Sequence, residues 1–354
     1  MKATPFVKWV GGKSQLAGII QGRLPTKINR YYEPFVGGGA IFFNLQDAGL
    51  IESHESFLSD INLNLLDTYI TVRDDVGTLI TRLEQLKKQI DTNFNMLRNM
   101  LIRDYKNELI NEYKAYLKKQ KNLIQAKLGS PPNPAFVQKL SDLQDEFNET
   151  NLLFFSRKMI FDELKNADRS PDFKIWSALD RATRFIFLNK TGFNGVYREN
   201  SKGHFNTPFG DQKNPNICDK NNSIKCNEAL QGVSIDNRFY CEIENDLQEG
   251  DFVYFDPPYV PLSSTSNFTG YTANSFDMDE QGRLRDMCIR LDKKGIKFMQ
   301  SNSNAKSVKE FYEDFTIEEV DATRLINSDA SSRGNVKEVI ITNYTDFRAK
   351  PFSF

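Results

Sequence analysis

Apolar residues recur through the middle of the chain at the spacing of one helix face. They lie three or four positions apart from Leu79 to Leu101, and the pattern continues less regularly to Leu123. This spacing places apolar side chains on one side of an α-helix. A glycine and three prolines at residues 129–134 then interrupt it. We therefore predict a long amphipathic helix or helical hairpin, then more helix to about residue 187. Because the stretch is rich in lysine, we interpret it as a solvated packing element.

Short apolar runs that are typical of buried strands lie on both sides of this helical middle. One is Tyr31-Tyr32, and the others are residues 251–255, 296–300, 315–320 and 336–343. A helical stretch at about 279–291 separates two of them. Alternating strands and helices predict an α/β sheet. We expect the last two runs to pair in antiparallel fashion, because the loop between them is polar.

The charge balance and the cysteines narrow the class of protein. The 354 residues carry 46 Lys and Arg against 47 Asp and Glu, so any surface that binds nucleic acid must be local. No run approaches 18 consecutive apolar residues, and the first residues lack the apolar core of a signal peptide. We therefore expect a cytoplasmic protein without a membrane partner. The four cysteines show no C-x-x-C spacing and cluster with neither histidine, so no metal site and no disulfide framework are expected.

The most informative motif is Asp256-Pro257-Pro258-Tyr259, directly after an apolar run. The prolines restrict the backbone, so the loop is expected to be extended and rigid. A bare motif of this kind is also typical of a strand-terminating turn. However, the Asp256 carboxylate and the Pro257 carbonyl can accept both N–H bonds of an exocyclic amino group, which frees the nitrogen lone pair to attack a methyl group. Tyr259 would supply a stacking face for a base taken out of the double helix.

A second motif, E-P-F-V-G-G-G at residues 33–39, follows the predicted strand at Tyr31-Tyr32. Consecutive glycines let the backbone approach a cofactor closely. The string is not a dinucleotide-binding fingerprint, because Phe42 stands where a glycine is required, and the G-G-K-S string at 11–14 is not a P-loop. Asp60 lies 21 residues after Gly39, the distance at which an acid on the next strand binds ribose hydroxyls. Together these features predict an adenosine-bearing cofactor without a pyrophosphate, S-adenosylmethionine.

The combined strings resemble the Dam-type DNA adenine methyltransferases (D12 class, alpha group). The resemblance rests on K-W-V-G-G-K at residues 8–13, E-P-F-V-G-G-G at 33–39, S-D-I-N at 59–62 and D-P-P-Y at 256–259. It includes residues 189–198 and 203–210, and it continues at 261–263, 267–271 and 331–334. It covers roughly residues 1–75 and 155–345. Residues 80–150 depart from it, because they are longer than the family leads us to expect.

The resemblance implies a set of residues that bind the cofactor. Lys13 can meet the methionine carboxylate and Asp60 the ribose, whereas Asp256 lies where the cofactor and the target base meet. The alternatives are core packing for Trp9 and a solvated side chain for Lys13. The implied set is Trp9, Lys13, Phe35, Gly37, Gly39, Asp60 and Asp256.

A basic segment at residues 181–213 carries the expected contacts with DNA. It holds six basic residues against two acidic ones, and its glycines and aromatic residues (Phe193, Tyr197, Phe205 and Phe209) predict a β-hairpin with exposed rings. A solvated hairpin is the alternative. Arg198 can form two hydrogen bonds with guanine in the major groove, and Phe193 can fill the stack near an extruded adenine. By resemblance, Lys8 and Arg198 would read guanine, and the recognition sequence would be GATC. The implied set that contacts DNA is Lys8, Phe193, Asn194, Val196, Arg198 and Pro208.

These features predict an S-adenosylmethionine-dependent DNA adenine methyltransferase with a Rossmann-like α/β core. Residues 1–66 and 229–354 would form this core. Residues 67–228 would form an inserted, mainly helical DNA-recognition domain with a helical insert (80–150) and a hairpin (189–213). Asp256, Pro257 and Tyr259 would be catalytic and would act on a flipped adenine of double-stranded DNA. Whether a restriction endonuclease acts on the same site stays open.

Two other functions remain as alternatives. Transfer to the cytosine N4 amino group uses similar chemistry, and a catalytically silent protein could still bind DNA. Transfer to cytosine C5 is excluded, because it needs a cysteine nucleophile, typically after proline, and no cysteine here follows a proline. The intact D-P-P-Y motif and Asp60 argue against a silent protein.

Overall fold

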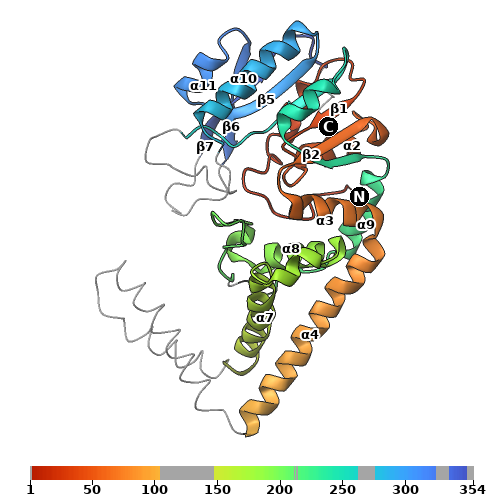
Figure 1. The fold of residues 1–354 in the computed structure, drawn as a ribbon, viewed down its shortest axis with the longest axis vertical. Helices are drawn as coiled ribbons and strands as arrows, with labels where there is room; N and C mark the ends of the chain where they lie inside the picture. Colours follow the sequence, from red (N-terminus) through yellow and green to blue (C-terminus); the bar gives the residue numbers. More distant parts are fainter. Residues whose placement is uncertain are drawn as a thin grey trace, which may run out of the picture.

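A seven-stranded sheet forms one end of the molecule (Figure 1). The computed structural model describes residues 2–103, 147–210, 212, 214–261, 276–323 and 335–348. The strands are β1 (Tyr31–Glu33), β2 (Ser56–Asp60), β3 (Ser234–Asn237), β4 (Phe252–Phe255), β5 (Lys297–Ser303), β6 (Thr316–Thr323) and β7 (Asn335–Thr342). They lie in the order β3-β2-β1-β4-β5-β7-β6, and of these strands β7 alone runs in the direction opposite to the others. The predicted α/β sheet and the antiparallel pairing of the last two strands are confirmed.

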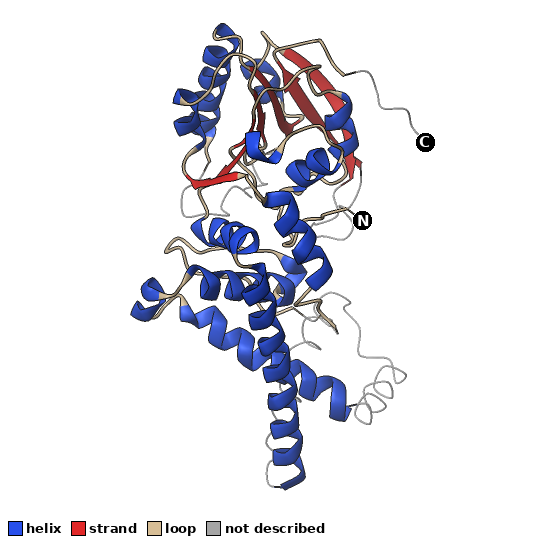
Figure 2. Cartoon of the chain, turned by 90° about the vertical axis from the view of Figure 1, so that its right-hand side faces the viewer, coloured by secondary structure: helices blue, strands red, loops and turns tan. Residues whose placement is uncertain are grey.

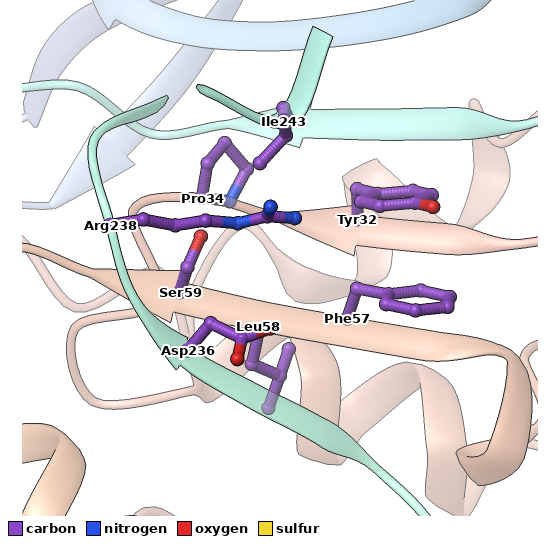
Figure 3. A pocket seen from close by; sticks show the side chains of 8 residues that line it. All are labelled: Tyr32, Pro34, Phe57, Leu58, Ser59, Asp236, Arg238 and Ile243. Atoms are coloured by element: carbon purple, nitrogen blue, oxygen red, sulfur yellow. The ribbon is translucent and has the colours of Figure 1, made fainter. Parts of the chain in front are cut away.

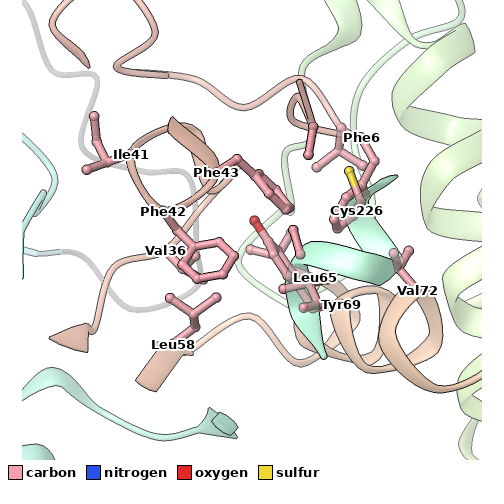
Figure 4. Packing of buried hydrophobic residues seen from close by; sticks show 14 of the residues in the cluster. Phe6, Val36, Ile41, Phe42, Phe43, Leu58, Leu65, Tyr69, Val72 and Cys226 are labelled. Carbon is pink, nitrogen blue, oxygen red and sulfur yellow. The ribbon is translucent and has the colours of Figure 1, made fainter. Parts of the chain in front are cut away.

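Helices cover both faces of the sheet, because alternate residues of a strand point to opposite sides. In β4, Phe252 and Tyr254 lie in one apolar cluster, part of which is drawn in Figure 4, and Val253 and Phe255 lie in the other. The first cluster packs on α1 (Ala17–Gly22), α2 (Ala40–Asp47), α3 (Leu63–Asp74) and α9 (Lys220–Leu230). The second cluster packs on η4 (Tyr240–Asn245), α10 (Met278–Lys293) and α11 (Lys306–Phe311). A 3₁₀-helix, η1 (Ser53–Glu55), precedes β2. The helix expected at about 279–291 is therefore α10.

A helical region makes up the other end of the molecule, away from the strands (Figure 2). It consists of α4 (Val76–Arg103), η2 (Pro171–Ile175), α7 (Phe147–Ala167), α8 (Ala178–Thr191) and η3 (Phe193–Gly195). α4 packs along α7, and α8 packs on α3 beside the sheet. The predicted amphipathic helix is confirmed as far as Arg103. The rest of that stretch, with its break at 129–134, lies outside the described residues, as do the strings at 262–263, 267–271 and 331–334.

The hairpin predicted at 189–213 is only partly confirmed. Residues 189–191 are the last turn of α8, and the chain beyond them forms two extended arms. Isolated antiparallel bridges join the arms at Gly192↔Phe209 and Glu199↔Phe205, but the arms contain no regular strand. Residues 211 and 213 lie outside the described chain.

The prediction that the hairpin exposes its rings is wrong for three of the four aromatic residues. Tyr197 and Phe205 are 4% and 0% exposed, and Phe209 is half-buried. The ring of Tyr197 lies 4.3 Å from that of Phe185 on α8. Phe193, which is 53% exposed, alone matches the prediction. The apolar face of α8 explains the difference, because burying an aromatic ring there is favourable by roughly 1.5–3 kcal/mol.

Part of the positive charge counted in this segment is neutralised within the protein. Arg181 pairs with Asp67 of α3, and the buried Arg184 pairs with Asp168 at 2.6 Å. Buried or partly buried pairs of this kind join elements rather than attract a ligand. The charge available to a ligand is therefore smaller than the sequence count suggests.

The described residues give no sign of a membrane span or a metal centre. None of the helices in this part of the chain is both long enough and apolar enough to cross a bilayer. Within the same residues, no three His, Cys, Asp or Glu side chains are grouped so that they could hold a metal ion. All four cysteines are free thiols.

Candidate active site

Three predicted residues meet at the carboxyl end of β4. The Lys13 ammonium lies 2.9 Å from Oδ1 of Asp256 and 4.5 Å from the centre of the Tyr259 ring. It also donates a hydrogen bond to the carbonyl of Gly11 at 2.6 Å. Lys13 is 7% exposed, so the alternative of a solvated lysine is wrong. The structure therefore joins the first motif of the chain to the D-P-P-Y loop.

The Asp256 carboxyl has a pKa above the usual value for an aspartate. Burial raises its pKa to about 6, against the lowering effect of Lys13, and Glu338 raises the pKa further. A carboxyl with this pKa is mostly ionised at neutral pH and can accept hydrogen bonds from a polar group beside it. A perturbed acid that is paired with a buried lysine indicates a functional site.

Buried polar side chains hold the D-P-P-Y loop in place. Gln281 of α10 donates a hydrogen bond to the Pro258 carbonyl (2.7 Å) and accepts one from Asn302 of β5 (3.2 Å). The Asn302 side chain accepts the Val260 N–H (3.2 Å), and the Ser303 hydroxyl donates to the Val260 carbonyl (2.6 Å). The sequence reasoning missed these three side chains. For Asn302 and Ser303 the available signal was the run of polar residues that ends the otherwise apolar strand β5, whereas no such signal marked Gln281.

The Tyr259 ring is held from two sides. Its hydroxyl donates a hydrogen bond to Oε2 of Glu338 on β7 at 2.7 Å, while the Lys13 ammonium lies over its face. Glu338 was also missed, because only the pairing of β7 with β5 brings it to the loop. The ring is thus held in a fixed orientation beside the Lys13–Asp256 pair.

The glycine motif forms a tight turn between β1 and α2. Gly37 and Gly39 have φ angles of +47° and +70°, which side chains rarely adopt. A Cβ on Gly37 would lie 2.6 Å from Cδ1 of Trp9, and one on Gly39 would lie 2.4 Å from the Tyr69 hydroxyl. The turn therefore requires glycine at both positions, and Trp9 packs directly on it.

Asp60 closes this turn from the end of β2. One carboxylate oxygen accepts the Gly37 N–H (3.1 Å), and the other accepts the Asn62 N–H (2.9 Å). Burial raises the pKa of Asp60, while these backbone hydrogen bonds lower it. The acid thus lies beside the glycine turn, in agreement with the predicted spacing.

A shallow hollow lies next to the turn, towards the carboxyl ends of β1, β2 and β3 (Figure 3). The Arg238 side chain reaches across it between Pro34 and Ser59. Phe35, which follows Pro34, stacks on Tyr240 with ring centres 5.3 Å apart. The hollow is lined by Tyr32, Pro34, Phe57, Leu58, Ser59, Asp236, Arg238 and Ile243.

Glu33 is a buried acid that the sequence reasoning did not single out. It ends β1, is 2% exposed and accepts a hydrogen bond from the Tyr31 hydroxyl at 2.7 Å. Burial raises the pKa of Glu33 to about 8, so the group is mostly protonated at neutral pH.

We expect Glu33 to make stability fall as the pH rises from about 5 to about 8. The folded state keeps the proton up to its raised pKa, whereas the unfolded state has already lost it, so the loss approaches about 1.4 kcal/mol per pH unit within this window. Glu33→Gln mimics the protonated acid and should flatten this dependence. Thermal unfolding of both proteins across this range is the measurement. Parallel curves for the two proteins would show that Glu33 is ionised in the folded state.

Four of the predicted DNA-contacting residues lie close together. Phe193 and Asn194 occupy the turn after α8, where Asn194 has a φ of +58°. The exposed Lys8 lies against the same turn, because a Cβ on Gly195 would be 2.9 Å from its Cδ. The exposed Pro208 accepts the Phe193 N–H at 2.9 Å. The structure thus brings the N-terminal segment together with the turn and arm at residues 193–208, which lie far from it in the chain.

Val196 and Arg198 follow on the arm beyond this turn, and both are half-buried. The Arg198 carbonyl accepts the Asn206 N–H from the opposite arm at 2.8 Å. Its Nε has no hydrogen-bond partner among the described residues. This Nε atom is buried, so it is not open to a ligand in the conformation described.

The chain is similar to known proteins along almost its whole length. It matches the family model of D12 class N6 adenine-specific DNA methyltransferases over residues 9–95 and 92–326. It is 34% identical to the type II methyltransferase M1.LlaDCHI of Lactococcus lactis subsp. cremoris over 96% of this chain and 95% of the relative. It is also 34% identical to the type II methyltransferase M.MjaIII of Methanocaldococcus jannaschii, over 97% and 100%. Identity to the DNA adenine methylase of Escherichia coli strain K12 is 27%, over 96% and 95%.

The matched regions contain the parts of the site described above. They include the glycine turn, Asp60 and the D-P-P-Y loop. The family implies S-adenosylmethionine as the methyl donor and DNA as the substrate. From its family match and from the relatives that match it end to end, this chain belongs to the D12 class N6 adenine-specific DNA methyltransferases.

Proposed function

We propose that this adenine-specific DNA methyltransferase modifies N6 of adenine in GATC within double-stranded DNA, after the base has left the helix. The observation that carries the proposal is the contact between Lys13 and Asp256, 2.9 Å apart. It joins the segment before α1 to the loop that follows β4, and the strand order reverses between β4 and its neighbour β1. Ligands of open α/β sheets bind at the carboxyl ends of strands at such a switch point.

The residues around the glycine turn fit S-adenosylmethionine. The turn requires glycine at Gly37 and Gly39, where a Cβ would meet Trp9 and Tyr69, so its backbone is fixed beside the Asp60 carboxylate. Asp60 would accept hydrogen bonds from ribose hydroxyls, and Lys13 would pair with the methionine carboxylate. Phe35 and Trp9 would border the ligand with apolar surface. The cofactor supplies an electrophilic methyl group on a positively charged sulfur.

The D-P-P-Y loop would activate the amino group of the adenine. Asp256 and the Pro257 carbonyl would accept its two N–H bonds, so that the nitrogen lone pair points at the methyl carbon. The Tyr259 ring would stack on the base. The new bond joins the nitrogen to the methyl carbon, the sulfur keeps the electron pair of the broken bond, and the amino proton leaves to solvent past Asp256.

Lys13 must move during this cycle. In the structure it occupies the Asp256 carboxylate and one face of the Tyr259 ring, which are the two groups that the base would use. A carboxylate on the cofactor would draw the ammonium away and free both groups. The arrangement therefore favours cofactor binding before the base enters.

Recognition of DNA would fall to the region at residues 67–228, which contains the helical end of the molecule. Lys8 and the turn at Phe193 and Asn194 form one exposed group, and the half-buried Arg198 lies on the neighbouring arm. Arg198 and Lys8 would contact guanine, and Phe193 would fill the gap left by the flipped adenine. Val196 and Pro208 would contact thymine.

The test is to sequence DNA from a methylation-free host that expresses this chain. We expect N6-methyladenine in GATC, with cytosine unmodified. Methylation in another sequence would contradict the proposed recognition site, and N4-methylcytosine would favour the cytosine alternative. A titration with S-adenosylmethionine separates an active enzyme from a silent DNA-binding protein, because the silent protein would leave the cofactor unbound.

We also propose that a restriction endonuclease with the same recognition sequence accompanies this enzyme. The identity is 34% to relatives named type II methyltransferases and 27% to DNA adenine methylases, which favours this role. An extract of the source organism should then cut unmethylated DNA but not DNA that this chain has methylated. An extract that leaves both DNAs intact would contradict the proposal.

Asp60→Ala should weaken cofactor binding more than DNA binding. The substitution removes the proposed ribose contact and frees the Gly37 N–H, which the carboxylate holds at 3.1 Å. Losing one charge-assisted hydrogen bond costs roughly 1.5–3 kcal/mol, or about ten- to a hundred-fold in affinity. Calorimetry with S-adenosylmethionine measures it, and an unchanged affinity would mean that Asp60 only shapes the turn.

A further inference from the structure

Asn189, near the end of α8, joins two segments that lie far apart in the chain. Its side-chain oxygen accepts the Lys8 N–H at 2.9 Å. Its amide nitrogen donates to the carbonyls of Lys8 (2.8 Å) and Gly195 (3.0 Å). Asn189 is 0% exposed, and these bonds use both of its N–H donors and its oxygen. The side chain is therefore a fully satisfied clamp inside the protein.

The clamp lies between the proposed DNA contacts and the proposed cofactor site. On one side it holds the backbone of Lys8, whose side chain rests against Gly195. On the other side, the next residue, Trp9, stacks on Phe185, one helical turn before Asn189. A single face of α8 thus fixes where the N-terminal segment meets the turn after the helix.

We propose that Asn189 is a positioning residue for sequence discrimination, which holds Lys8 in register with the turn that carries Phe193 and Asn194. This inference rests on the proposed DNA contacts of those residues. Asn189 is too deeply buried to touch DNA, so it acts through its neighbours. A base contact needs placement to within roughly 0.5 Å, whereas a contact with a phosphate tolerates more displacement. Loss of the clamp should therefore reduce discrimination between sequences more than it reduces binding to all of them.

Asn189→Asp is the direct test, because aspartate has the same shape but cannot donate the two hydrogen bonds. Asn222 of α9 provides a matched control. It bonds the same N-terminal segment four residues earlier, by accepting the Thr4 N–H (3.0 Å) and donating to the Thr4 carbonyl (2.8 Å), and none of its described hydrogen bonds reaches the turn. Asn222→Asp therefore loosens the segment without touching the clamp.

The recognition sequence is first determined with the unaltered enzyme, and duplexes that differ from it at one base pair are then compared. The Lys8→Ala variant identifies the base pair at which Lys8 discriminates, because this variant accepts a change there. At this base pair we expect Asn189→Asp to lower the ratio of kcat/KM on the cognate duplex to kcat/KM on the altered duplex by about ten-fold. The double variant Asn189→Asp/Lys8→Ala should show the same ratio as Lys8→Ala alone, because both substitutions disable the same contact between Lys8 and a base. Asn222→Asp should leave the ratio unchanged. Binding affinities on the same duplexes give the readout without turnover.

Gly195→Ala keeps the inference testable if the buried aspartate prevents folding. Its Cβ would lie 2.9 Å from Cδ of Lys8, and its φ of +67° strains the turn whose carbonyl Asn189 holds. The substitution therefore displaces Lys8 without placing a charge at residue 189, and the same base pair should lose discrimination. An equal loss of rate on every duplex, or the same profile in Asn222→Asp, would overturn the inference. A recognition sequence other than GATC would contradict only the proposed function, because the duplexes are built on the sequence that is found.

Discussion

Asp256→Ala is expected to slow methyl transfer by at least about a hundred-fold while the protein still folds. The substitution removes the carboxylate that would accept one N–H bond of the adenine amino group. Removing one preorganised polar group of this kind typically costs about 10²–10³ in rate. The loop itself should persist, because Gln281, Asn302 and Ser303 hold its carbonyl and amide groups.

Single-turnover transfer of a tritiated methyl group measures this effect. Thermal unfolding and DNA affinity of the variant serve as controls for its fold. Glu338→Gln is a matched variant, because it removes a nearby charge but keeps an acceptor for the Tyr259 hydroxyl, and its rate should fall far less. A folded Asp256→Ala enzyme that transfers methyl groups at a nearly normal rate would show that the amino group needs no carboxylate.

Arg198→Ala should narrow the preference for GATC over singly altered duplexes by up to about a hundred-fold. An arginine that forms two hydrogen bonds with guanine is worth about 1–3 kcal/mol of discrimination. Arg198 is half-buried on the arm beyond the turn, and the hydrogen bond from the Asn206 N–H to its carbonyl holds that arm. The rate on GATC should therefore drop much further than the rate on duplexes altered at the guanine that it reads.

Lys202→Ala is the control for this prediction. Lys202 is exposed in the loop between the two arms. Its side chain can therefore contact a phosphate, but no neighbouring residue that the structure describes holds it in the position that a contact with a base edge requires. Its loss should weaken binding to all duplexes alike and lower the slope of affinity against salt by about one. If Arg198→Ala also slows every duplex by one common factor, Arg198 positions the DNA backbone and does not read the sequence.

Features that depend on neighbouring residues in the chain were predicted well. Strands β1, β4, β5, β6 and β7 and helix α10 were found because apolar patterns reflect burial on a local period, whereas the short strand β3 was not predicted. The glycine turn and the D-P-P-Y loop were found because glycine and proline restrict the backbone wherever they occur. The helix from residue 76 onward was found for the same reason as the strands.

Features that depend on distant neighbours were predicted poorly. Rings such as Tyr197 looked exposed because a short glycine-rich segment cannot bury them alone, but α8 supplies the apolar surface. Arg181 and Arg184 looked available because a charge count ignores partners on other elements. Nothing in the spacing of the chain indicated Gln281 or Glu338.

The sequence by itself determined which chemical groups this enzyme has and which short loops carry them, because motif geometry and burial patterns are local properties. Only the tertiary structure decided which of these groups meet. Lys13 reaches Asp256 because the segment before α1 lies at the carboxyl end of β4, and Asn189 reaches Lys8 because α8 packs beside the same N-terminal segment. Such contacts depend on how the whole chain folds, since the partners are separated by many residues and each bond is short-ranged.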